Sequence, residues 1–137
     1  MLLAYPDGAA DADAVAAWLA RREAAGALRI VADDGGAALG FVQLHDIHRR
    51  GGHAMLAIAL LPEARGRGVG RAALDALHDL ARREFGLRKL MLEVRADNAA
   101  AIALYQAMGY RTVGTLRAHY DDGARLHDVC VMERLLP

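Results

Sequence analysis

The residues best suited to chemistry lie in one segment, LLPEARGRGVGR at positions 60–71, in which glycines and arginines alternate. Gly66, Gly68 and Gly70 leave backbone N–H groups accessible, because a glycine has no side chain to cover them. A helix that begins directly after the glycines would add the partial positive charge of its N-terminus. With the arginine side chains around it, the segment predicts a binding site for an anion, most naturally a phosphate.

The segments on either side of the glycines predict how this site is held. His53 to Leu61 is a continuous apolar run of strand length, and it ends at Pro62, which has no N–H to donate to a sheet. From Val69 to Phe85 apolar residues recur at helical spacing, and Gly86 provides a helix end. The sequence therefore predicts a buried strand, a glycine-rich turn and then a helix.

A glycine-rich turn alone is compatible with several functions. A nucleotide-hydrolysing P-loop would carry Lys and then Ser or Thr after its last glycine, whereas Arg71 and Ala72 stand there. A dinucleotide-binding fingerprint is a stronger rival, because residues 68–73, GVGRAA, fit its spacing and Glu93 follows 20 residues later. A tight turn without any ligand is the third alternative.

A resemblance to the GCN5-related N-acetyltransferase (GNAT) superfamily distinguishes these alternatives. Its motif R/Q-x-x-G-x-G/A stands here as Arg65-Gly-Arg-Gly-Val-Gly70, and residues 90–110, LMLEVRADNAAAIALYQAMGY, resemble the second half of the family. The likeness extends over roughly Gly40 to Met132. It is greatest to the bacterial ribosomal-protein alanine N-acetyltransferases, followed by the phosphinothricin and polyamine types. A dinucleotide domain would need more strand–helix units after Glu93 than the sequence provides.

The resemblance implies acetyl-CoA as the cosubstrate and assigns residues to it. The pyrophosphate would bind the backbone of the glycine-rich turn, and the pantetheine arm would lie along the preceding strand like an added strand. An N–H group of that strand would face the carbonyl oxygen of the acetyl group. The residues implied for cofactor binding are Ile58, Leu60, Arg65, Gly66, Arg67, Gly68, Val69, Gly70, Arg71 and Asn98, which also caps the next helix.

The resemblance also implies two catalytic residues, Tyr105 and Glu93. Tyr105 is the expected general acid, since a phenol with a pKa of about 10 can reprotonate a departing thiolate. The alternative is an aromatic side chain that only fills the edge of the core. Glu93 is the expected base, with His53 or a chain of waters as the alternative. Many relatives carry a Glu on the cofactor-binding strand, where Met55 stands here.

The acceptor is expected to be a primary amine, either a peptide N-terminus or a small molecule. An α-amino group, with a pKa of about 8, loses its proton more readily than a lysine side chain, so a weakly supplied base favours it. Tyr120, in a loop or surface turn expected after residue 116, and His53 are weaker candidates for contacts with the acceptor. The histidines at 119 and 127 are spaced too loosely for a metal site, so no metal is expected.

The whole pattern predicts one α/β domain, residues 1–137, with a mostly antiparallel sheet, a central parallel strand pair and flanking helices. The parallel pair follows because a helix connects its two strands. Before residue 28 there is room for a short strand at residues 2–5 and one helix that ends near Gly26, where relatives usually have two helices. This shortening predicts an open acceptor cleft or one completed by a second subunit, as in a homodimer. The other expected elements are Leu28–Ala32, Ala38–Leu44, Arg88–Val94, Asn98–Gly109, Tyr110–Leu116 and Leu126–Leu136.

The composition excludes other classes of protein. The formal net charge of the 137 residues is zero, so neither nucleic acid nor an anionic membrane is an expected partner. No apolar run approaches the length of about 18 residues that a spanning helix needs, and no signal peptide is recognisable, which favours the cytoplasm. Cys130, the only cysteine, stands in an apolar run and is expected to be buried and dispensable.

These features predict an N-acetyltransferase that moves an acetyl group from acetyl-CoA to an amine by direct attack, without a covalent enzyme intermediate. The alternative is a non-catalytic module of the same fold that holds acyl-CoA as a sensor or docks a partner. Met55 and the short N-terminal region motivate that alternative. A nicotinamide-binding fragment is the third hypothesis.

Overall fold

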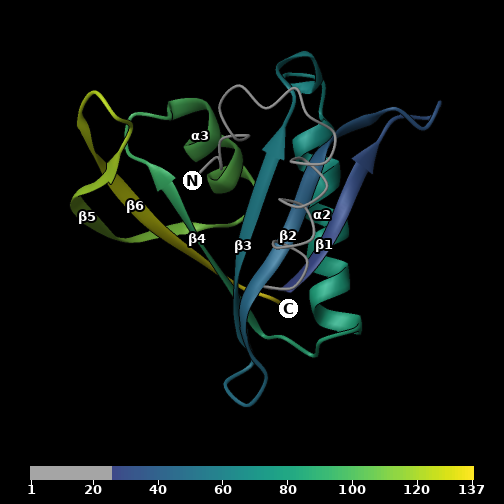
Figure 1. Ribbon diagram of the computed structural model, residues 1–137. Helices are drawn as coiled ribbons and strands as arrows, with labels where there is room; N and C mark the ends of the chain where they lie inside the picture. The colour runs from purple at the N-terminus through teal and green to yellow at the C-terminus, as the bar shows by residue number, and fades with distance from the viewer. Residues whose placement is uncertain (1–25) are drawn as a thin grey trace.

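The computed structural model of the chain describes residues 26–137, which form strands and two α-helices around one sheet (Figure 1). The strand, the helix and the open acceptor cleft expected from the first 25 residues lie outside this part of the chain. Gly26, expected near the end of that helix, is the first residue of a strand. In chain order the elements are β1 (Gly26–Ala32), β2 (Ala38–His48), β3 (His53–Leu60), the 3₁₀ turn η1 (Pro62–Ala64), α2 (Val69–Arg83), β4 (Lys89–Arg95), α3 (Ala99–Ala107), β5 (Arg111–Asp121) and β6 (Leu126–Leu135).

The six-stranded sheet has the order β1-β2-β3-β4-β6-β5. Only β3 and β4 are parallel, and α2 connects them, while all other neighbours are antiparallel. This confirms the predicted fold class, a mostly antiparallel sheet with a central parallel pair.

The parallel pair is held together at one end only. β3 and β4 are paired from His53 opposite Lys89 to Met55 opposite Met91, and no further. Figure 1 shows the two strands diverging toward the end at which α3 lies. On its other side β3 stays paired with β2 as far as Leu60. One edge of β3, from residue 56 to residue 60, therefore has no pairing with β4.

Helix α2 covers one face of the sheet, behind β1 and β2 in Figure 1. Its buried residues are Ala73, Leu74, Leu77, His78 and Ala81, which share one side of the helix as the helical spacing predicted. The four apolar ones join one cluster with apolar side chains of β2, β3 and β4. The core therefore fixes the start of α2 at the end of β3.

Two expectations for the C-terminal half are wrong. Residues 117–120, expected to form a loop or turn, continue β5 as far as Asp121. The strand carries a bulge between Leu116 and Tyr120, with Ala118 at a φ of 48°, and this bulge disrupts the alternation that would identify a strand in the sequence. Cys130 is half-buried rather than buried.

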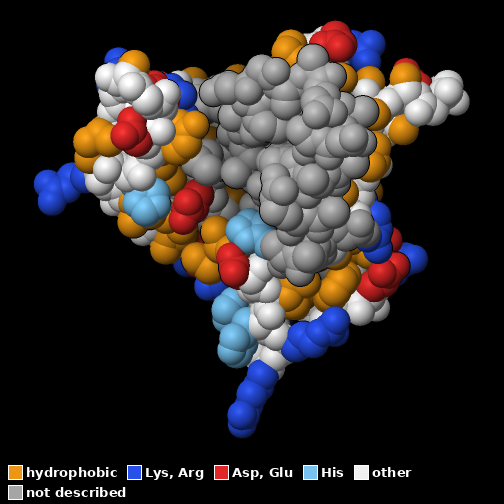
Figure 2. All heavy atoms as spheres, viewed as in Figure 1, with side chains coloured by type: hydrophobic (Ala, Val, Ile, Leu, Met, Phe, Trp, Pro, Cys, Tyr) orange, Lys and Arg blue, Asp and Glu red, His pale blue; other side chains and the backbone are white. Residues whose placement is uncertain are grey.

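The charged side chains on one face of the molecule are dispersed (Figure 2). On the face shown in Figure 2, Lys and Arg side chains are separated from one another and do not form one patch. Between residues 26 and 137, no helix has the length and apolar character needed to cross a bilayer.

The close approach of β2 and β3 at Gly40 yields a prediction about stability. A Cβ atom at Gly40 would overlap the Ala59 carbonyl oxygen and lie 2.8 Å from the Leu60 Cα. We expect Gly40→Ala to lower the free energy of unfolding in urea by on the order of 2 kcal/mol, because β3 has to move. In the control Gly35→Ala, the nearest atom would be the Asp33 Oδ1 at 3.4 Å. Equal unfolding midpoints for the two variants would contradict this account.

Candidate active site

A pocket of about 400 Å³ lies where β3, the glycine-rich turn and α3 meet. It brings together most of the residues that the sequence assigned to cofactor binding, along with the expected general acid. The predicted residues that line it are Ile58, Leu60, Arg65, Gly66, Gly68, Gly70, Arg71, Asn98 and Tyr105. Its position beside the unpaired edge of β3 makes it the candidate active site.

The sequence analysis missed part of the pocket wall, which comes from α3. Ala100, Ala101 and Leu104 line the pocket, and Leu104 also packs on the glycine-rich turn. A Cβ atom at Gly70 would lie only 3.0 Å from the Leu104 Cδ2. Gly70 therefore allows α2 and α3 to approach closely. The helical spacing of Ala101, Leu104 and Tyr105 could have identified this wall, since such residues share one helix face.

Gly66 and Gly68 are required for the shape of the turn. Their φ angles are 73° and 78°, in the left-handed region that other residues rarely adopt. A Cβ atom at either position would have no heavy atom of residues 26–137 within 4 Å, apart from the immediate chain neighbours. The space next to both glycines is therefore open to a ligand.

The start of α2 offers hydrogen-bond donors to that ligand. Gly68 is the N-cap and has no side chain that could cap the helix. The first hydrogen bond is donated by the Ala72 N–H to the Gly68 carbonyl at 3.1 Å, and within residues 26–137 no backbone carbonyl accepts from the N–H groups of residues 66–71. These amides and the helix dipole together form a site for an anion.

The polar side chains of Arg65 and Asn98 form hydrogen bonds with the backbone at the edge of the pocket. The Arg65 Nε donates to the Leu60 carbonyl at 3.3 Å, which ties the turn to the end of β3. The Asn98 Oδ1 accepts from the Ala101 N–H at 3.1 Å, so the prediction that Asn98 caps α3 is confirmed. Two helices therefore begin at the rim of the same pocket.

Tyr105 lines the pocket, although only 4% of its surface is exposed. Its ring packs edge-on against Tyr110, with 5.9 Å between the ring centroids. Burial raises the pKa of Tyr105 to about 12, because an apolar environment disfavours the phenolate. Tyr105 thus belongs both to the core and to the wall of the pocket, and its phenol is protonated at neutral pH.

Glu93 lies outside this pocket, on the opposite face of the sheet. Leu92 and Val94 are buried in the core beneath α2, so the alternation of a strand directs Glu93 to the other side. Its carboxylate lies 4.0 Å from the Nε2 of His119 on β5, and its side chain is 36% exposed. Glu93 and His119 are therefore adjacent titratable groups, and the sequence did not predict this pairing.

The two weaker candidates for acceptor contacts lie apart from each other. His53 begins β3 and stacks on His48 with 4.9 Å between ring centroids. Ile58 lies five positions further along the strand, or about 16 Å away. The ring of Tyr120 lies beneath the Arg95 guanidinium, 5.9 Å away. The structure therefore does not bring His53 and Tyr120 together.

A polar network fixes the β5–β6 hairpin against β4. The Asp122 carboxylate lies 2.6 Å from the His127 Nε2, and Asp97 lies 3.5 Å from the His127 Nδ1. Arg95 donates to Asp97 at 2.8 Å and 3.0 Å. The hydrogen bond with His127 keeps the pKa of Asp122 well below its usual range. Between residues 26 and 137, no group of three potential ligand side chains could hold a metal ion.

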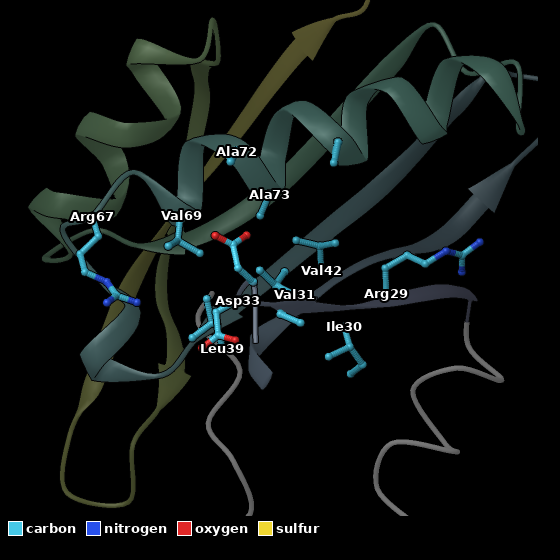
Figure 3. Close-up of a pocket in the computed structure, with 13 residues that line it drawn as sticks. Arg29, Ile30, Val31, Asp33, Leu39, Val42, Arg67, Val69, Ala72 and Ala73 are labelled. Carbon is cyan, nitrogen blue, oxygen red and sulfur yellow. The ribbon is translucent and has the colours of Figure 1, made fainter. Parts of the chain in front are cut away.

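Two of the predicted residues line a second, shallower groove of about 580 Å³ between β1, β2 and α2. Figure 3 shows the side chains of Arg67 and Val69 at the end of this groove nearest the glycine-rich turn. Neither residue lines the pocket at Tyr105, so their side chains lie apart from the other predicted cofactor-binding residues. The groove is larger than the pocket at Tyr105, but neither Tyr105 nor any of the turn glycines lines it.

The chain belongs to the acetyltransferase (GNAT) family, whose family model matches residues 3–110. It is 40% identical over 75 residues to the ribosomal protein bS18-alanine N-acetyltransferase of Escherichia coli strain K12, covering 55% of this chain and 50% of that protein. It is 34% identical over 87 residues to an N-alpha-acetyltransferase of Saccharolobus solfataricus, covering 64% of this chain and 50% of that protein. The chain thus spans about half the length of these relatives.

Solved structures of acetyltransferases have the same fold. The spermidine N-acetyltransferase from Vibrio cholerae in complex with CoA and spermine has a TM-score of 0.82 at 25% identity, covering 92% of this chain and 76% of that one. The ribosomal-protein-S18-alanine N-acetyltransferase from Escherichia coli has a TM-score of 0.74 at 28% identity, covering 89% and 76%. The fold of this chain is therefore shared with a structure that contains CoA.

The open space at Gly68 leads to a prediction about CoA binding. We expect Gly68→Val to weaken CoA binding about tenfold or more in calorimetry, because the new side chain fills the approach to the amides. Gly86→Val is the matched control, since Gly86 also has a positive φ, 61°, and an added Cβ would meet no heavy atom of the described residues within 4 Å. Equal CoA affinities of the two variants would show that the turn does not hold the phosphates.

Proposed function

We propose that the chain is an acetyl-CoA-dependent N-acetyltransferase that acts on primary amines. The observation that carries this proposal is one pocket that joins the turn amides, the unpaired edge of β3 and the phenol of Tyr105. Acetyl transfer from a thioester needs all three: a site for the phosphates, a strand edge for the pantetheine arm, and an acid for the thiolate. Membership of the GNAT family and the CoA-bound neighbour support it.

The cosubstrate is held mainly by backbone groups. The N–H groups of residues 66–71 receive the pyrophosphate, with the charges of Arg65 and Arg71 nearby. Beyond Met55, the edge of β3 that is not paired with β4 forms hydrogen bonds with the amides of the pantetheine arm, as a neighbouring strand would. An N–H on this edge faces the carbonyl oxygen of the acetyl group and stabilises the negative charge that develops on it.

The transfer takes place in the gap between β3 and β4, with the two proton-transfer groups on opposite faces of the sheet. Tyr105 lies on the face of Ile58, and Glu93 lies on the face of Met91. The amine approaches from the side of Glu93, gives up its ammonium proton to that carboxylate or to a water between them, and the neutral nitrogen forms the new C–N bond. The C–S bond then breaks, Tyr105 gives its proton to the departing thiolate, and the nitrogen loses its second proton to water as the amide forms.

The acceptor belongs to the class of peptide N-termini or small-molecule amines. Relatives named for the alanine of a ribosomal protein and for spermidine support both members of that class. A panel with an alanine-initiated peptide, a lysine-containing blocked peptide and spermidine tests the proposal by mass spectrometry and by release of the CoA thiol. CoA binding without turnover of any of these amines would favour the alternative, a non-catalytic module that binds acyl-CoA. That alternative is suggested by Met55, which stands where many relatives carry a Glu.

The cellular setting is a further part of the proposal. Relatives that act on a ribosomal protein support a cytoplasmic location. A homodimer and the absence of metal, nucleic-acid and membrane partners stay predictions from the sequence.

Tyr105→Phe tests the general acid. The change removes one oxygen and keeps the ring that packs against Tyr110. We expect kcat to fall about 100-fold or more, because the thiolate loses its proton donor, while CoA affinity stays within about a factor of two. Steady-state kinetics and calorimetry measure the two quantities. A kcat within about twofold of the wild type would remove Tyr105 from the mechanism.

Glu93→Gln tests the base. At pH 7 we expect kcat/KM for a peptide α-amine to fall about 100-fold, and the deficit should shrink above pH 8 because the amine then loses its proton unaided. Glu84→Gln is the control, since Glu84 lies exposed next to Arg29 and lines no part of the pocket at Tyr105. A deficit that is equally large at pH 7 and pH 9 would indicate a role in binding rather than in proton transfer.

A further inference from the structure

A buried histidine lies behind the candidate acid, and the mechanism above gives it no role. His78 is on the core side of α2, and 6% of its surface is exposed. The Arg134 Nη1 lies 2.7 Å from its Nδ1, and the Tyr110 hydroxyl lies 2.7 Å from its Nε2. Arginine can only donate, so Nδ1 must be the acceptor and the neutral ring carries its proton on Nε2. His78 therefore donates to the Tyr110 oxygen.

Tyr110 in turn holds Tyr105 at two points. The two rings pack edge to face at an interplanar angle of 66°. The Tyr110 N–H donates to the Tyr105 carbonyl at 2.9 Å, across the turn that ends α3. Arg134 also lies against that turn, since a Cβ atom at Gly109 would be 3.2 Å from its Nε. The position of the Tyr105 phenol therefore depends on a chain of contacts that begins on α2.

The chain of contacts connects the two ends of the candidate active site. Helix α2 starts at Val69, directly after the turn proposed to hold the phosphates, and it carries His78 further along. From this geometry we infer that His78 is a positioning residue: through Tyr110 it fixes the phenol of Tyr105 relative to the phosphate end of the pocket. The inference rests on the proposed acetyltransferase function.

The surrounding charges keep this hydrogen-bond chain in one state. The titratable groups around His78 are Arg134 on β6, Tyr110 before β5 and Asp75 on α2 itself. Burial and the charge of Arg134 lower the pKa of His78 to about 4, against the opposite effect of Asp75. Protonation would set two donors, the Nδ1–H and the Arg134 guanidinium, against each other. The hydrogen-bond chain through His78 is therefore intact at neutral pH and is lost as the pH falls toward 4.

Substitutions at His78 separate positioning from stability. We expect His78→Leu to lower kcat about tenfold or more, with KM for acetyl-CoA within about a factor of two, because a displaced acid affects the chemical step alone. His78→Gln should recover much of the loss, since its amide N–H can donate to Tyr110. Leu77→Val, at a buried position on the same helix that is not part of this hydrogen-bond chain, is the control that loses stability and keeps kcat.

Arg134→Met provides a readout that a purely structural role would not change. Without the neighbouring positive charge the pKa of His78 rises, but its protonated ring no longer faces an opposing donor and still donates from Nε2 to Tyr110. The loss of kcat at acidic pH that depends on His78 should therefore be smaller than in the wild type. In the His78→Gln background the same substitution should have no such effect. ¹⁵N NMR of the wild-type histidine rings, which needs no substrate, should show His78 protonated on Nε2 at neutral pH.

The outcomes distinguish the two proposals. A wild type that acetylates no amine would overturn the proposed function, and this inference with it. An active wild type with an unchanged kcat in folded His78→Leu protein, or with Nδ1 protonated in the NMR spectrum, would overturn the positioning role and leave the acetyltransferase proposal standing. If His78→Leu does not fold, Arg134→Met and the NMR measurement still decide the matter.

Discussion

The early end of the pairing between β3 and β4 is the constraint on which the rest of the site depends. Two parallel strands that are joined only as far as Met55 and Met91 leave a gap in the middle of the sheet. Backbone groups along such a gap need partners, because unpaired N–H and C=O groups are costly when water is excluded. A ligand with amides of its own, such as a pantetheine arm, provides those partners, so the same break in the sheet creates both the opening and the means to bind in it.

Both helices begin at the open end of this gap, and that arrangement concentrates positive potential there. α2 starts after Gly68 at the end of β3, and α3 starts after Asn98 beyond the end of β4. The two starts differ in a way that matters. Asn98 caps its own helix through its side chain, whereas Gly68 has no side chain and leaves the first amides of α2 for another acceptor. Of these two helix starts, the start of α3 is capped by a side chain of the protein and the start of α2 is not, so the candidate anion site lies at the start of α2.

Local features of the site could be predicted from the sequence, and long-range pairings could not. The strand, the turn and α2 were predicted because spacing, Pro62 and the glycines act on their immediate neighbours. The contact of His119 with Glu93 depends on how β5 lies against β6 and β6 against β4, and a bulge in β5 disrupts the pattern that would have indicated a strand. His78 and Arg134 are 56 residues apart, so no local pattern connects them.

The buried hydrogen-bond chain from Arg134 through His78 to Tyr110 contributes more to geometry than to stability. Moving polar groups out of water costs free energy, and a fully satisfied buried network is seldom more stable than apolar side chains of the same volume. Apolar contacts, however, tolerate sliding and rotation, whereas a hydrogen bond fixes both distance and direction. An acid that has to meet a thiolate in a narrow pocket needs that direction. The network therefore replaces adaptable packing with a defined link between the helix that begins at the anion site and the phenol at the other end of the pocket.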